Sequence, residues 1–141
     1  MLRIVPLERE HLDKLKPNEA AGFISVWLDD TVKDQLANSM AFSAIDDGEV
    51  LCCAGVAEYW PGRAGAWAMI AGDLGSRFIG VHRAVKQFLE DSGHCRIEAA
   101  TAVGFCEGHR WLEMLGFKKE TEVMKGYLPN GKDATMYVRG I

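Results

Sequence analysis

Hydrophobic and polar positions along the chain follow two periods, which predict a mixture of helices and strands. Residues 2–7 have a strand pattern, and residues 9–15 have a short helical pattern that stops before Pro17. From Asn18, which can cap a helix, apolar residues recur every three or four positions up to Leu36. This stripe predicts one continuous helix from Asn18 to Leu36.

The middle of the chain has the pattern of a β hairpin followed by a buried strand. Segments 40–45 and 50–59 flank Asp46-Asp47-Gly48-Glu49, a sequence that favours a tight turn between antiparallel strands. Residues 66–71 form a nearly continuous apolar run, which is typical of a strand buried on both faces.

The second half of the chain predicts two more helices and three more strands. An apolar stripe from Phe78 to Leu89 indicates a helix that closes at Ser92-Gly93. The remaining predicted elements are a strand at 96–103, a helix at 106–115, and strands at 117–127 and 134–138.

The end of the helix at 106–115 is the most informative stretch of the sequence. Trp111, Leu112 and Leu115 share one face at helical spacing. Gly116 suits a left-handed cap that passes Phe117 directly to the next strand. This "W-L-x-x-L-G-F" ending resembles the last helix of the GNAT N-acetyltransferases, commonly written "L-Y-x-x-x-G-F". The predicted order of elements also resembles that family over almost the whole chain.

The resemblance implies an α+β fold in a single GNAT-like domain covering residues 1–141. The GNAT acyl-CoA N-acyltransferase fold has a central mixed sheet, here of about six or seven strands, with flanking helices. In that fold the fourth and fifth strands are parallel neighbours that splay apart at one end. Segments 66–71 and 96–103 match those strands, and the gap between them would admit the pantetheine arm of acetyl-CoA or another acyl-CoA.

Composition limits the classes of partner. The chain has 141 residues, a formal net charge of -4 and a pI near 5.5, which argue against binding to nucleic acid or anionic lipid. No apolar run approaches the ~18 residues of a membrane span, and the N-terminal residues lack a signal-peptide pattern. We therefore expect a cytoplasmic protein without a membrane partner.

The four cysteines lack metal-ligand spacing and are expected to be small buried hydrophobes, and no metal site is predicted.

The resemblance also implies where a cofactor would bind. GNAT enzymes hold the CoA pyrophosphate with a loop written Q/R-x-x-G-x-G/A, whose backbone N–H groups point at the phosphates from a helix N-terminus. His82 departs from this pattern, because glycine or alanine usually occupies that position. The expected cofactor contacts are Met69, Ile70 and Ala71 on the fourth strand and Arg77, Phe78, Ile79, Gly80, Val81 and His82 in the loop. Alternatively, Phe78, Val81 and His82 simply form the inward face of a helix.

The acid and base that are familiar in this family have no counterpart at the matching positions. Leu112 replaces the tyrosine that often protonates the leaving thiolate, and Trp67 lies where some members carry a glutamate base. Glu58, Asp73 and Tyr127 are the candidate substitutes, on the expectation that Glu58 ends the third strand and Tyr127 lies on a closing strand. Each has a plain alternative as a solvated strand end or as sheet packing.

Other polar residues are expected to be structural. His109 is expected on the solvent face of its helix, and Tyr137 in half-buried sheet packing. Cys106, at a helix N-terminus, is expected to pack rather than to react.

A narrower resemblance concerns short GNAT-like proteins of tailed bacteriophages, some of them internal virion proteins. It rests on Ala66-Trp67-Ala68-Met69, on Arg110-Trp111-Leu112 through Phe117, and on the ending Gly131-Lys132-Asp133-Ala134-Thr135-Met136-Tyr137. Three functions remain open. The chain could be an N-acetyltransferase acting on a small-molecule or protein amine, a non-catalytic phage protein that is virion-associated or binds a host protein, or a CoA sensor. The resemblance also implies a homodimer formed through the last strands.

Overall fold

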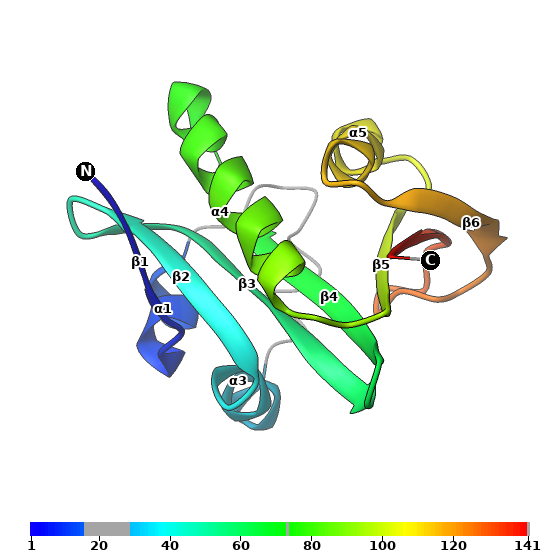
Figure 1. The fold of residues 1–141 in the computed structure, drawn as a ribbon, viewed down its shortest axis with the longest axis horizontal. Coiled ribbons are helices and arrows are strands. Elements are labelled where there is room, and N and C mark those ends of the chain that lie inside the picture. Colours follow the sequence, from blue (N-terminus) through cyan, green and yellow to red (C-terminus); the bar gives the residue numbers. More distant parts are fainter. Residues whose placement is uncertain (16–28, 73, 141) are drawn as a thin grey trace. The chain divides into compact units, whose positions relative to one another are not determined.

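The computed structural model describes residues 1–15, 29–72 and 74–140, so most of the helix predicted from Asn18 lies outside the described residues. The strands are β1 (Leu2–Pro6), β2 (Met40–Asp46), β3 (Glu49–Trp60), β4 (Arg63–Ile70), β5 (Arg96–Ala102), β6 (Lys118–Met124) and β7 (Ala134–Arg139). The helices are α1 (Arg9–Lys14), α3 (Asp30–Ala37), α4 (Phe78–Asp91) and α5 (Cys106–Met114), with a 3₁₀ turn η2 (Gly75–Arg77). The strands form one mixed sheet in the order β1-β2-β3-β4-β5-β7-β6 (Figure 1).

The chain divides into two compact units. Unit 1 comprises residues 1–57 and 67–92, and unit 2 comprises residues 58–66 and 93–141. The boundary passes through β3 and β4, so the last residues of β3 and the first residues of β4 belong to unit 2.

The predicted hairpin in unit 1 is confirmed. β2 and β3 pair antiparallel, and the turn between them places Asp47 at φ 49° and Gly48 at φ 81°. Two successive residues with positive φ match a type I′ turn, whose twist suits the flanking strands. The Asp-Gly sequence is therefore the local cause of this hairpin.

Two helices of unit 1 cover opposite faces of β2. The ring of Phe42 on β2 lies 5.1 Å from the ring of Phe88 on α4. The next residue, Ser43, lies with its Oγ 2.8 Å from Nδ1 of His11 on α1. Because successive strand residues point to opposite faces, α4 and α1 lie on opposite sides of β2, and Figure 1 shows α4 in front of the sheet near β3.

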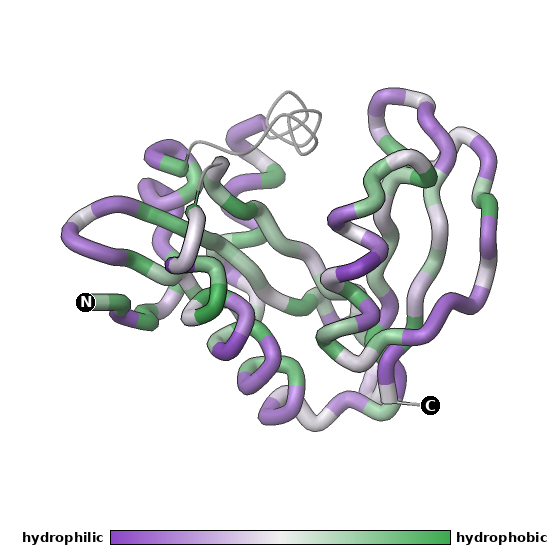
Figure 2. The backbone as a smooth tube through the Cα atoms, turned by 90° about the horizontal axis from the view of Figure 1, so that it is seen from above, coloured by the Kyte–Doolittle hydropathy of each residue, from purple (hydrophilic) through white to green (hydrophobic). Residues whose placement is uncertain are grey.

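The helical stripe predicted for α4 is confirmed. Val81, Val85 and Leu89 are buried at three- and four-residue spacing. The same alternation is visible along α4 when the backbone is coloured by hydropathy (Figure 2). The apolar side of α4 therefore packs on the sheet of unit 1.

The prediction of one continuous helix from Asn18 to Leu36 is wrong. α3 begins at Asp30, and the residue before it, Asp29, has an extended backbone with φ -83° and ψ 177°. The Asp29 carboxylate accepts a hydrogen bond from the Val32 N–H at 2.9 Å, which caps the new helix. An apolar period alone does not reveal such a cap.

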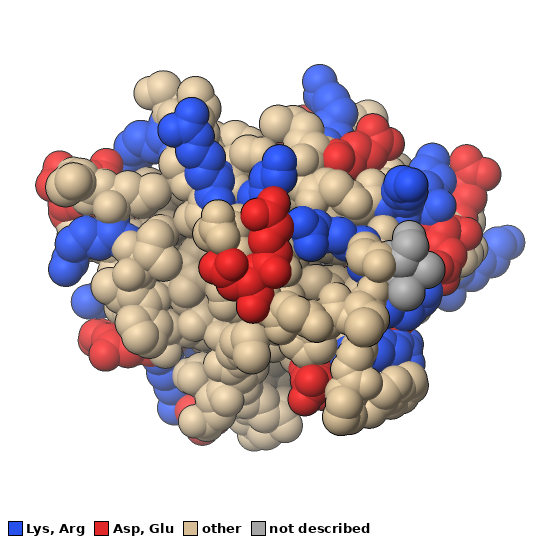
Figure 3. Space-filling model, in the orientation of Figure 1, with Lys and Arg blue, Asp and Glu red and all other residues tan. Residues whose placement is uncertain are grey.

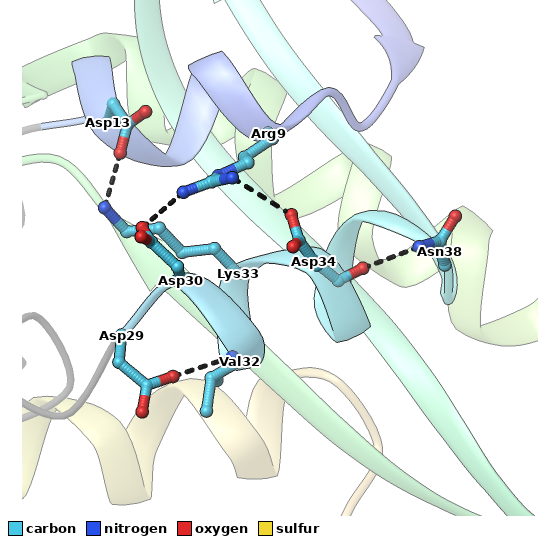
Figure 4. Close-up of polar contacts among 8 residues, drawn as sticks. All are labelled: Arg9, Asp13, Asp29, Asp30, Val32, Lys33, Asp34 and Asn38. Atoms are coloured by element: carbon cyan, nitrogen blue, oxygen red, sulfur yellow. Dashed lines mark hydrogen bonds and ion pairs between the residues drawn. The ribbon is translucent and has the colours of Figure 1, made fainter.

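A polar network joins α3 to α1. Arg9 on α1 contacts Asp30 and, at 3.2 Å, Asp34 of α3, and Lys33 of α3 contacts Asp13 of α1 (Figure 4). These pairs are exposed to solvent, so they orient the two helices and contribute little stability.

Unit 2 is built on β5 and β7. β7 pairs antiparallel with β5 on one side and with β6 on the other. Gly116 has φ 95° after α5, and Phe117 is buried, so the predicted left-handed cap is confirmed. The strand predicted at 117–127 ends at Met124, after two register shifts, and Gly126 turns the chain with φ 63°. Tyr127 therefore lies in a loop, and the prediction that it lies on a closing strand is wrong.

The pairing of β4 with β5 is short. The two strands run parallel, and their register covers Arg63↔Arg96, Ala64↔Ile97 and Gly65↔Glu98 only, although β4 continues to Ile70 and β5 to Ala102. β4 is also less buried than predicted, because Trp67 and its neighbours Ala66 and Ala68 are only half-buried.

The surface carries charges of both signs. Lys and Arg side chains are interspersed with Asp and Glu on the face shown in Figure 3. Among the described residues, no helix combines the length and apolar character that crossing a membrane requires.

Candidate functional site

The candidate site is the part of unit 1 formed by β4 from Trp67 onward and the first turn of α4. Met69 and Ala71 are buried there, with 2% and 7% of their surface exposed. The Ala71 N–H donates to the carbonyl of Leu51 on β3 at 2.8 Å. β4 is thus held by β3, while its register with β5 has ended at Gly65.

The 3₁₀ turn η2 leads directly into α4 without a break. The Arg77 N–H donates to the Leu74 carbonyl at 3.1 Å, and the Phe78 N–H donates to the carbonyls of η2. Val81 and later residues lie where an α-helix bonds to its own carbonyls. The carbonyls of Gly75 and Ser76 stand four residues before Ile79 and Gly80, so the start of the helix offers an anion chiefly the positive end of the helix dipole.

Gly80 has a packing role in addition to any role in binding. A Cβ placed on Gly80 would lie 2.9 Å from Cδ2 of Leu2 on β1. The missing side chain therefore lets β1 pack closely on α4. The sequence predicted this glycine as a cradle for phosphate, and it did not reveal the contact with Leu2.

Arg77 is engaged by two carboxylates of the hairpin turn. Its Nη1 lies 2.8 Å from Oε2 of Glu49 and 3.7 Å from Oδ2 of Asp46. The hydrogen bond that Arg77 donates to Glu49 is the main reason that the pKa of Arg77 is raised. A phosphate that approaches this guanidinium must therefore share it with Glu49 or displace Glu49.

His82 brings no positive charge to the site at neutral pH. Burial, and then the neighbouring charges of Lys86 and Arg83, lower the pKa of His82 below its ordinary value. A neutral imidazole does not attract a phosphate. The positive end of α4 is thus the anion-binding element that the backbone itself provides.

Trp67 has an unusual environment on β4. Its indole Nε1 is buried, and it has no hydrogen-bond partner among the described residues. Buried donors in folded proteins are nearly always paired. The sequence resemblance would place a catalytic base at this position, and an indole cannot act as one because it only donates.

The three candidate catalytic residues are not brought together among the described residues. Glu58 and Tyr127 belong to unit 2, and Asp73 lies outside the described residues. The Glu58 carboxylate lies 3.0 Å from Nε2 of His94, so it is not a simple solvated strand end. Tyr127 is half exposed in its loop, and burial of the remainder raises the pKa of its hydroxyl.

A buried carboxylate dominates the electrostatics of unit 2. Glu98 on β5 is 7% exposed and accepts hydrogen bonds from Arg63 at 2.5 and 3.0 Å and from Arg96 at 2.8 Å. The bonds from Arg63, then those from Arg96, hold the pKa of Glu98 at about 2 against the opposing effect of burial. Arg63 also stacks on the rings of Tyr59 and Trp60 at 4.8 and 4.6 Å. The sequence contained no signal for this cluster.

This cluster predicts acid sensitivity. Because the folded pKa of Glu98 lies near 2 and the unfolded value near 4.5, its contribution to stability is present above about pH 4.5 and is lost as the pH falls towards 2. We expect the free energy of unfolding to fall by about 3 kcal/mol over this range from this group alone. Urea titrations at pH 6, 4 and 2 measure the loss of stability, and Glu98→Gln should show a smaller loss. A wild-type decline that Glu98→Gln reproduces in full would contradict the assignment.

His109 is structural, contrary to the prediction that it faces solvent. Its Nε2 lies 3.1 and 3.0 Å from the carbonyls of Ala102 and Val103, and its Nδ1 lies 2.8 Å from the hydroxyl of Tyr137. Since carbonyls only accept, Nε2 carries the proton and Tyr137 donates to Nδ1. Tyr137 is 1% exposed and not half-buried. The pair fastens α5 to β5 and β7.

The cysteines only partly match their predicted role. Cys52 and Cys53 are buried, and burial raises the pKa of both thiols. Cys95 and Cys106 are exposed, so the prediction that all four are buried is wrong.

A possible metal-ligand group lies at the start of α1. Ligand atoms of Glu8, Glu10 and His11 lie within 4.8 Å of one another. The Glu8 N–H and the Ser43 hydroxyl already occupy Nδ1 of His11, at 3.1 and 2.8 Å. This arrangement caps a helix and supports no metal assignment.

Comparison with solved structures identifies the fold. No family model matches the chain, and no curated protein matches it in sequence. An N-acetyltransferase from Staphylococcus aureus Mu50 superposes with TM-score 0.74 at 10% identity, covering 99% of this chain and 97% of that one. Ard1 from Thermoplasma volcanium gives 0.75 at 14% identity, covering 98% and 96%. The ribosomal-protein-S18-alanine N-acetyltransferase from Escherichia coli gives 0.68 at 15% identity, covering 99% and 93%. The chain therefore has the GNAT acyl-CoA N-acyltransferase fold.

Proposed function

We propose that the chain is an N-acyltransferase that uses acetyl-CoA or another acyl-CoA. The observation that carries the proposal is the early end of the β4–β5 register at Gly65↔Glu98. Backbone groups of β4 beyond Gly65 can then pair with the amides of a pantetheine arm, as an added strand would. The GNAT fold of the chain supports the same reading.

The residues present fit such a ligand at two places. The β4 edge from Ala66 to Ile70 supplies donors and acceptors along the arm. The positive end of the 14-residue helix α4 suits the pyrophosphate. The fit at Arg77 is poorer, because Glu49 holds its guanidinium.

The transfer requires little from the protein beyond position and polarity. The amine nitrogen forms a bond to the thioester carbon, the carbon–sulfur bond breaks, and its electron pair leaves on sulfur. One proton leaves the nitrogen and one reaches the sulfur, so the products are an amide and free CoA thiol. The acceptor would be a small-molecule or protein amine. We further propose that the protein is cytoplasmic and forms a homodimer.

Calorimetry with acetyl-CoA tests the proposal directly. We expect binding at micromolar strength with one site per chain, and release of free thiol when a panel of amines is added. Absence of heat at millimolar acetyl-CoA, together with no ligand-dependent rise in melting temperature, would overturn the proposal.

Releasing Arg77 should strengthen CoA binding. In Glu49→Gln the guanidinium loses its main carboxylate partner and becomes available to the pyrophosphate. We expect a gain in CoA affinity of about two- to fivefold, because the pair is exposed to solvent. Glu122→Gln, an equal change of charge on β6 in unit 2, is the matched control and should leave affinity unchanged. Equal effects of both variants would show a general charge effect and not a contact with Arg77.

A second candidate function is a non-catalytic role, virion-associated or in binding a host protein, as in the phage proteins that the sequence resembles. It is favoured by the engagement of Arg77 with Glu49 and Asp46. It is also favoured by Leu112 and Trp67 at the positions of the family's acid and base. Absence of acetyl-CoA binding would support this alternative, whereas binding without thiol release in any amine panel would support a CoA sensor.

A further inference from the structure

A buried hydrogen-bond donor on β4 has no acceptor in the described part of the chain. This donor is the indole Nε1–H of Trp67. An unpaired buried donor reduces stability, so one that persists in a fold calls for a partner beyond the described residues, and a bound ligand can supply it. An indole donates and cannot accept, which makes that partner an oxygen or nitrogen acceptor.

The place of Trp67 along β4 narrows the choice of acceptor. It lies two residues after Gly65, where the register with β5 ends, and side chains of alternate strand residues share a face. From Trp67 to Ala71 the strand rises about 13 Å, and the positive end of α4 follows later in the chain. Unit 1 thus offers the positive end of a helix after one end of this strand segment and an unpaired indole donor at the other end.

We propose that the Trp67 Nε1–H donates a hydrogen bond to the acyl carbonyl oxygen of a bound acyl thioester. This rests on the proposed function, since an acyl-CoA carries its phosphates at one end and its acyl carbonyl at the other. The carbonyl oxygen gains negative charge when an amine attacks the carbon, so a donor already in place stabilises that charge. Trp67 is then a catalytic residue that contacts the acyl group. It stabilises the charge on the carbonyl oxygen and does not act as a base.

Comparing two ligands in two variants tests the assignment. The wild-type protein should bind acetyl-CoA about tenfold more tightly than CoA, the gain from one added hydrogen bond. Trp67→Phe keeps an aromatic ring, removes the donor, and should bind both ligands equally. Trp60→Phe, at an exposed tryptophan ending β3, should keep the wild-type preference. A Trp67→Phe protein that keeps the preference, or loses affinity for both ligands alike, overturns the proposal.

A spectroscopic reading remains valid even if Trp67→Phe folds poorly. The chain has four tryptophans, so a ¹⁵N-labelled sample shows four indole N–H signals, which single Trp→Phe variants at the other three positions assign by elimination. Acetyl-CoA should move the Trp67 signal downfield, and CoA should move it less. A Trp67 signal that is unmoved by bound acetyl-CoA overturns this inference alone, whereas failure of both ligands to bind removes the proposed function as well.

Discussion

Glu98→Ala should lower the free energy of unfolding by about 3–5 kcal/mol, the usual cost of removing one partner of a buried ionic cluster. The register places Arg63 directly opposite Arg96, so two like charges meet on neighbouring strands. Glu98, two residues further on β5, bonds to both guanidinia and offsets their repulsion. In the Glu98→Ala variant, the like charges of Arg63 and Arg96 remain opposite each other without the carboxylate between them. This repulsion acts within the short register of three residue pairs that joins β4 to β5.

The exposed neighbour Glu120 provides the control for this prediction. It binds the same Arg96 in a bidentate pair at 2.9 and 2.6 Å, but 46% of its side chain is exposed. Glu120→Ala should therefore cost only a small fraction of the loss in Glu98→Ala, because water screens the pair. Urea denaturation of both variants at pH 7 measures the difference, and similar midpoints would contradict the central role of Glu98.

Local signals in the sequence predicted most of the fold. The Asp47-Gly48 turn fixed the hairpin, Gly116 marked the end of α5, and the stripe at Val81, Val85 and Leu89 identified α4. Each of these features depends on a few neighbouring residues, which is why a single sequence reveals them. The limits of one domain over residues 1–141 stay a prediction.

Errors arose where a distant partner or a local cap decides the structure. Asp29 caps α3 and breaks the stripe that seemed continuous from Asn18, and no apolar period reports such a cap. His109 is fixed by Tyr137, 28 residues away, so helical periodicity assigned it wrongly to solvent. Such long-range contacts can be predicted only when the register of the sheet is known.

In the candidate site, too, local features were predictable from the sequence and long-range contacts were not. Position in the sequence located β4 and the start of α4 correctly, because strand and helix patterns are local. The environment of its polar groups was not predictable, since Glu49 holds Arg77 and Leu2 covers Gly80 from elements far along the chain. The free donor of Trp67 was equally hidden, because it depends on what surrounds the indole and not on the indole itself.

Gly55→Ala should destabilise unit 1 by about 2–3 kcal/mol, through crowding that neighbouring side chains cannot relieve. Gly55 on β3 pairs with Ala41 on β2, and a Cβ there would lie 2.5 Å from the Met40 carbonyl oxygen and 2.9 Å from the Ala41 Cα. Both are backbone atoms, so the two strands must move apart, and β3 is the strand that holds β4 through Leu51.

The control for Gly55→Ala is Gly104→Ala, because a Cβ at Gly104 meets no atom within 4 Å and its φ does not require glycine. We expect that substitution to change stability by less than about 0.5 kcal/mol. Urea midpoints measure both variants, and calorimetry with acetyl-CoA should show weaker binding for Gly55→Ala, since displacing β3 displaces the β4 edge. Equal stability of the two alanine variants would contradict the prediction. It would show that β2 and β3 can accommodate the added Cβ, and that β3 is not a rigid support for the β4 site.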